Sequence, residues 1–141
     1  MTPRQMLLVQ DSFAAIVPKR DEIARSFYDN LFVIDPGLRP MFPADLSDQG
    51  KKLMQVLTVV VRSLENLEPL LPSIDDMARR HVAYGVKDDH YAIVGQALIR
   101  TLRHGCGPAF TAETEEAWRL AYTILSTRMI TATKPRELLA A

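Results

Sequence analysis

Residues 73–85 decide the fold class and read SIDDMARRHVAYG. Three apolar residues and one histidine recur there at intervals of three and four, at Ile74, Met77, Ala78 and His81. This spacing places the four side chains on one face of an α-helix. Ser73 is the predicted N-cap of that helix, and Gly85 is predicted to end it.

The same spacing recurs on both sides of this segment, whereas the alternation of apolar and polar residues that is typical of strands is scarce. Thr2 and Gln5 form a predicted capping box, with Pro3 at the first helical position. Nine prolines and six glycines lie mostly between the periodic segments. No apolar face keeps a strict heptad, so a coiled coil is not expected. We predict an all-α protein of about six long helices, over residues 3–17, 19–32, 47–64, 74–84, 87–104 and 112–129.

The composition argues against several classes of protein. The 17 basic residues balance 17 acidic ones, and a net charge of zero argues against a nucleic-acid-binding protein. No apolar run approaches the roughly 20 residues that cross a bilayer, and no targeting segment is visible. The single cysteine, Cys106, excludes an intrachain disulfide and fits a cytoplasmic location. A length of 141 residues predicts one domain over residues 1–141.

Polar residues on predicted buried faces are the candidate functional groups, because common nucleotide-binding and hydrolase motifs are absent. His81 lies on the apolar face of its helix, and Gln49 begins the apolar face of another. A buried polar group costs roughly 1–3 kcal/mol unless it finds a partner. Ordinary interpretations exist. His81 could bond a backbone carbonyl in the core, Gln49 could face solvent, Tyr28 could be a core tyrosine, and Phe42 could pack in a proline-rich corner.

Together these four residues match the needs of haem. An imidazole can serve as the axial iron ligand, apolar side chains can form a slot for the porphyrin, and a phenol and an amide can donate hydrogen bonds to a gas on the opposite face. A helical packing domain without haem is the alternative.

The sequence resembles the bacterial single-domain haemoglobins related to the globin part of flavohaemoglobins, from about Arg4 to Met129. The resemblance rests on short strings in a fixed order and spacing. These are FYDNLF at 27–32, RPMF at 39–42, ENLEPLLP at 65–72, RH at 80–81, GV at 85–86, HYAIVG at 90–95 and the pairs AW and AY at 117–122. It implies a globin fold, a three-on-three helical sandwich around haem b.

The resemblance also implies roles for individual residues. His81 matches the proximal iron ligand and is the one expected metal ligand. Phe42 matches the phenylalanine that wedges against the porphyrin. Tyr28 and Gln49 match the distal residues that face the bound gas, and Leu53 matches the apolar distal residue one turn further along.

The resemblance also covers other positions near the proximal histidine, and one of them departs from the family pattern. Tyr91 matches a proximal-side tyrosine, and Arg80 could reach a haem propionate or be an ordinary surface arginine. His90 is not the expected ligand, because it falls in the first turn of its helix. Flavohaemoglobin-type globins carry a glutamate that contacts the proximal imidazole and strengthens it as a donor. Thr133 takes that position here, and Glu137 follows in the wrong place.

The expected function is reversible binding of O₂, with NO and CO as further gaseous ligands and no catalytic residue assigned. The alternative is a nitric oxide dioxygenase that forms nitrate. Because the sequence ends at Ala141 without a flavin or nicotinamide domain, that activity would need an external reductase. A haem-based sensor is disfavoured, because 141 residues leave no room for an output domain. We expect a monomer or weak homodimer.

Overall fold

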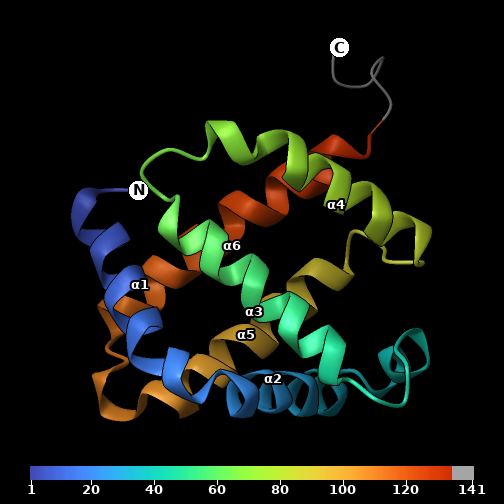
Figure 1. Ribbon diagram of the computed structural model, residues 1–141, viewed down its shortest axis with the longest axis horizontal. Coiled ribbons are helices and arrows are strands. Elements are labelled where there is room, and N and C mark those ends of the chain that lie inside the picture. The colour runs from blue at the N-terminus through green and yellow to red at the C-terminus, as the bar shows by residue number, and fades with distance from the viewer. Residues whose placement is uncertain (135–141) are drawn as a thin grey trace.

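The computed structural model describes residues 1–134, which form six α-helices joined by loops and short 3₁₀ turns (Figure 1). No strand occurs within these residues, so the predicted all-α class is confirmed. The helices are α1 (Pro3–Ile16), α2 (Arg20–Ile34), α3 (Ser47–Arg62), α4 (Leu71–Ala83), α5 (His90–Cys106) and α6 (Ala112–Ala132).

Local signals in the sequence explain several helix ends. The Thr2 hydroxyl accepts the Gln5 amide hydrogen at 3.2 Å, and the Gln5 side chain accepts the Thr2 amide hydrogen at 2.8 Å. This reciprocal pair is the predicted capping box. Pro18 lies in the 3₁₀ turn Val17–Lys19, which separates α1 from α2. Thr111 caps α6 by accepting the Thr114 amide hydrogen at 3.2 Å.

Two predicted helix starts are wrong. Ser73 is not an N-cap, because the 3₁₀ turn Glu68–Leu70 leads directly into α4, which already begins at Leu71. The fifth helix begins three residues later than expected. A turn precedes it, closed by the His90 amide donating to the Lys87 carbonyl and the Lys87 amide donating to His90 Nδ1, both at 3.0 Å.

The helix contacts link the six helices in pairs: α2 packs along α5, α1 and α4 pack on α6, and α3 packs on α2. These contacts fit the three-on-three arrangement that the resemblance implies, with α1, α3 and α4 as one layer and α2, α5 and α6 as the other. No helix within residues 1–134 is both long and apolar enough to span a membrane.

The buried apolar side chains form two clusters of unequal size. The main core joins α1, α2, α3, α5 and α6, with Val9, Leu31 and Leu102 almost completely buried. The smaller cluster consists of Ile74 and Ala78 of α4 with Met129 of α6. Within the described residues, α3 and α4 make at most marginal contact with each other. The layer that holds them is therefore not closed by packing between these two helices.

Candidate functional site

The imidazole of His81 is held in a defined tautomer by its own helix. Its Nδ1 atom lies 2.7 Å from the carbonyl oxygen of Met77, one turn earlier in α4. A carbonyl oxygen only accepts, so Nδ1 carries the proton and Nε2 of the neutral ring keeps a free lone pair. Within residues 1–134, Nε2 has no hydrogen-bond partner, and the side chain is only half-buried. This is the state of a histidine that can coordinate a metal through Nε2.

His90 differs from His81 in the use of its ring. It is the first residue of α5, and its Nδ1 accepts the amide hydrogen of Lys87. The neutral ring therefore carries its proton on Nε2, which removes both nitrogens as metal ligands. The structure thus supports the preference for His81 over His90, while the ligand role itself stays a prediction.

Tyr28 lies on α2 inside a cluster of aromatic rings. Its ring centroid is 5.1 Å from that of Phe27, 6.3 Å from that of Phe32 and 5.7 Å from that of Phe42. Only 4% of the residue is exposed, and this burial raises the pKa of the phenol to about 12. The hydroxyl is therefore protonated at neutral pH and available as a donor.

The structure brings Tyr28 and Gln49 together, but not in the way the sequence indicates. The Tyr28 hydroxyl donates to the backbone carbonyl of Gln49 at 3.3 Å. That separation exceeds the usual 2.7–2.8 Å for such bonds, so the interaction is weak. Within the described chain, the side-chain amide of Gln49 makes no hydrogen bond. Gln49 and Leu53 are both half-buried on α3.

Phe42 lies at the predicted corner between α2 and α3, half-buried against Phe32 with ring centroids 5.5 Å apart. Arg39 stabilises this corner, and the sequence analysis gave this arginine no role. Its guanidinium donates to the carbonyl of Phe42 at 3.3 Å, that of Pro43 at 3.0 Å and that of Ala44 at 3.2 Å, and lies over the Phe32 ring. The string RPMF carries this arginine, but its three carbonyl partners are not encoded in any motif.

Tyr91, the predicted proximal-side tyrosine, lies in the first turn of α5. Its half-buried side chain packs against the small cluster of α4 and α6. Burial, and secondarily Asp88, raise its pKa. The Tyr91 carbonyl accepts the Tyr122 hydroxyl at 2.6 Å, which ties α5 to α6. Gly95 permits this contact, because a Cβ there would lie 2.8 Å from the Tyr122 ring.

The roles of the remaining positions that the resemblance assigns near the proximal histidine stay predictions. Thr133 is the C-cap of α6, and its hydroxyl donates to the Ile130 carbonyl at 2.9 Å. Glu137 lies outside the described residues. Arg80 is exposed, and within residues 1–134 it forms no ion pair, whereas its neighbour Arg79 pairs with Asp76 at 2.8 Å.

Half-buried apolar side chains on three helices could contribute to a site for a flat apolar group. Among them are Leu53 and Val56 of α3, Met77 of α4 and Val94 of α5. Covering such surface stabilises a complex by roughly 25 cal/mol per Å². Together with a free imidazole lone pair on one side and a neutral phenol on the other, the residues present fit haem.

Comparisons with known proteins agree with this geometry. The sequence model of the Globin family matches residues 25–129. A flavohaemoprotein of Bordetella parapertussis is 30% identical over 133 residues, which cover 92% of this chain and 33% of that protein. One of Vibrio cholerae is 26% identical over 129 residues, or 89% of this chain and 33% of that protein. The chain thus spans about a third of the length of these relatives.

Solved structures give the same result at the level of the fold. A bacterial globin of Campylobacter jejuni superposes with a TM-score of 0.84 at 26% identity, covering 99% of this chain and all of that one. An engineered carbene transferase, from a protein of Rhodothermus marinus provisionally assigned as a nitric oxide dioxygenase, reaches 0.83 at 27% identity and covers 99% and 96% of the two chains. Because the family match extends over most of the sequence and the whole fold agrees with it, this chain belongs to the globin family, whose members hold haem and bind gaseous ligands.

Proposed function

We propose that this protein is a haem b globin that binds O₂ reversibly, with His81 as the proximal ligand and Tyr28 and Gln49 as distal donors. The observation that carries the proposal is the hydrogen bond from His81 Nδ1 to the Met77 carbonyl, which leaves Nε2 free. Haem, when bound, would supply an iron atom that can coordinate the His81 imidazole and a diatomic gas.

The distal residues are suited to favour O₂ over CO. Tyr28 is a neutral phenol whose present bond to the Gln49 carbonyl is long, so redirecting its proton toward a ligand costs little. The amide of Gln49 makes no competing bond within the described residues. Bound O₂ carries more negative charge on its outer atom than CO does, and it therefore gains more from these two donors.

The proximal residues favour reversible binding over cleavage of an O–O bond. His81 donates to a backbone carbonyl, a weaker acceptor than a carboxylate, and Thr133 spends its hydroxyl on its own helix. Strong donation from the imidazole would need a carboxylate partner. The described part of the chain supplies none at the position of Thr133.

Nitric oxide dioxygenase activity is the second candidate, because the chain is related to flavohaemoproteins and resembles the Rhodothermus marinus protein. The same distal donors serve this reaction, which combines NO and O₂ into nitrate and needs electrons from a reductase. NO consumption and nitrate formation, measured with and without a flavin reductase, separate the two functions. We also propose a cytoplasmic monomer or weak homodimer.

Absorption spectra of the purified protein, oxidised, reduced and reduced with CO, test the central proposal. We expect the bands of a haem with one histidine ligand and a shifted band on CO addition. A protein that takes up no haem under reconstitution contradicts the proposal.

A further inference from the structure

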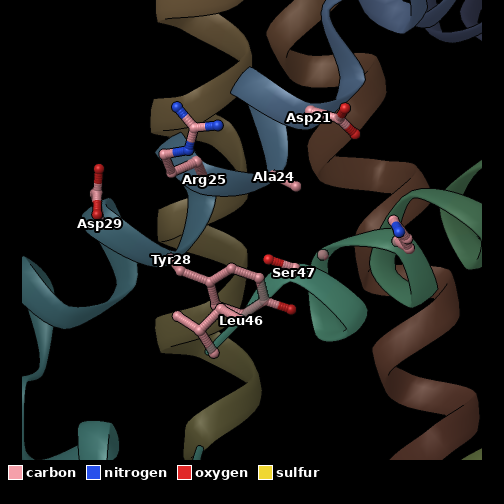
Figure 2. A pocket seen from close by; sticks show the side chains of 9 residues that line it. Asp21, Ala24, Arg25, Tyr28, Asp29, Leu46 and Ser47 are labelled. Atoms are coloured by element: carbon pink, nitrogen blue, oxygen red, sulfur yellow. The ribbon is translucent and has the colours of Figure 1, made fainter. Parts of the chain in front are cut away.

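A pocket of about 400 Å³ lies between α2 and the start of α3, on the outer side of Tyr28 (Figure 2). Its inner wall is formed by Ala24 and Tyr28 of α2 together with Leu46 and Gly50. All four are buried or half-buried. Its rim consists of exposed polar side chains, namely Asp21, Arg25, Asp29, Ser47 and Lys51. The pocket therefore leads from a hydrated rim to a mostly apolar floor.

The Tyr28 ring is the partition between this pocket and the aromatic corner. Figure 2 shows the ring reaching from α2 toward the start of α3, where Leu46 and Ser47 lie. Besides lining the pocket, the ring packs edge-on against Phe42, the predicted porphyrin contact, at 5.7 Å. One side chain thus separates the outer pocket from the predicted distal side.

The partition is a single buried side chain with one weak hydrogen bond, whereas the helices that frame it are in close contact. A Cβ on Gly50 would lie 3.0 Å from the Ala24 Cβ, so α2 and α3 are in close contact beside the pocket. In contrast, the Tyr28 hydroxyl has one hydrogen bond, and its length of 3.3 Å makes that bond weak. A rotation of the ring breaks this one bond and shifts the ring against its aromatic neighbours, whereas a separation of the helices would disrupt the packing along both of them.

We propose that this pocket is the route by which a small uncharged gas reaches the distal side, and that the Tyr28 ring is its gate. The inference rests on the proposed function. A diatomic gas needs no polar partner in the pocket, which suits the apolar floor formed by Ala24, Leu46 and Gly50. Tyr28 would then act twice, as gate during passage and as donor after binding.

A route differs from a binding contact in its kinetic signature. An obstacle on the route raises the barrier to association and to dissociation equally, because the gas passes the same point in both directions. The equilibrium affinity then stays constant. A lost hydrogen bond instead speeds release and lowers the affinity.

Lys51→Trp, which places a large side chain at the rim, tests the route against Lys52→Trp as a matched control. Both lysines are exposed on α3, but only Lys51 lines the pocket. Ser47→Trp places the same bulk at a second rim position. CO association after flash photolysis and CO dissociation by ligand displacement are measured for the wild-type haem protein and the three variants.

We expect Lys51→Trp or Ser47→Trp to slow both CO rates by the same factor, about threefold or more, which is an added barrier of about 0.7 kcal/mol. Lys52→Trp should behave as the wild type. If neither rim variant departs from Lys52→Trp, or if only dissociation changes, the route is elsewhere and the proposal is wrong. Failure of the proposed function would instead appear as a wild-type protein without a CO spectrum.

Discussion

Tyr28 and Gln49 lie on helices that are built into the main core, whereas His81 lies on a helix that reaches the rest of the protein chiefly through α6. On the distal side, α2 packs along α5 and α3 packs on α2 and α1. On the proximal side, α4 shares only the small cluster of Ile74, Ala78 and Met129. A two-pronged ion pair, from Arg128 to Asp75 at 2.8 Å, adds to this attachment and lowers the pKa of Asp75.

The helices on the two sides therefore differ in what holds them in place. Tyr28 and Gln49, the proposed distal donors, lie on helices that are packed into the main core, and the Tyr28 hydroxyl needs only to leave the Gln49 carbonyl to face a ligand. The proximal helix has fewer apolar partners, and segments with few such contacts open at lower free energy. Haem bound to His81 would supply the apolar contacts that α4 lacks.

Substitution of His81, the proposed proximal ligand, should have the largest effect, which is the loss of haem. We expect His81→Ala to lose haem or to require added imidazole, because His81 is the only histidine of α4. His90→Ala is the control, since its ring caps a turn and should not contact iron. Absorption spectra and haem titration distinguish the two variants. The opposite pattern would overturn the assignment of His81.

Substitution of the distal donor should change release of the gas while leaving haem in place. Tyr28→Phe removes one hydroxyl with little change in volume, so O₂ dissociation should rise roughly tenfold or more, as expected for a charge-assisted bond worth about 1.5–3 kcal/mol. CO dissociation should change much less. Stopped-flow measurements test this. Equal changes for both gases would mean that the ring acts by packing or access and not as a donor.

Gln49→Leu should act in the same direction as Tyr28→Phe, because its amide is the second donor. The double variant should be non-additive, since both donors serve one acceptor. Additive effects would show that Gln49 and Tyr28 act on different steps.

Removal of haem should enlarge the difference in local stability between α4 and the helices α2 and α5. In the haem-free protein we expect amides of α4 to exchange with solvent about fivefold faster or more, relative to the haem protein, while α2 and α5 change little. Hydrogen–deuterium exchange read by mass spectrometry measures each helix separately. A uniform loss of protection over all helices would show that haem supports both sides equally.

Unfolding at alkaline pH should reveal the raised pKa of the buried Tyr28 phenol. The pKa of Tyr28 is raised to about 12 by burial, against 10 in an exposed tyrosine. Between pH 10 and 12 the unfolded chain loses this proton first, so the free energy of unfolding falls as the pH rises, by up to about 1.4 kcal/mol per pH unit. Tyr28→Phe should therefore show a shallower decline in urea unfolding experiments. Parallel curves would mean that Tyr28 titrates normally.

The smallest expected effect is on the rate of haem loss after substitution of Arg80 in α4. Arg80→Ala should speed haem loss to an acceptor protein by about twofold, the scale of an exposed ion pair, if Arg80 reaches a propionate. Arg79→Ala is the control, because that guanidinium already pairs with Asp76. Identical rates would favour an ordinary surface role for Arg80.

Periodicity in the sequence predicted the helices well because each helix has a continuous apolar face, and proline and glycine separate them. It failed where a helix start depends on what precedes it. Ser73 has the chemistry of an N-cap, but the 3₁₀ turn before it already sets the helical path. Helix α5 begins later than predicted because the His90 ring accepts a hydrogen bond from the Lys87 amide, and no spacing rule contains such a bond.

The candidate site was predictable as a set of side chains but not as a set of bonds. The sequence placed Tyr28 and Gln49 near each other, but their contact runs through a backbone carbonyl. Likewise, the supports at Arg39 and Tyr122 act on carbonyls of Phe42 and Tyr91. Every residue type has a carbonyl, so sequence carries no signal for these partners.

The guanidinium of Arg39 has a consequence for the protein before haem binds. By donating to three consecutive carbonyls, it gives the corner around Phe42 a shape that depends on polar bonds and not on burial by a cofactor. The planar fork of arginine suits this task, since a lysine offers one point of attachment. The corner would therefore keep its shape before haem binds, with Phe42 already placed as the proposed porphyrin contact.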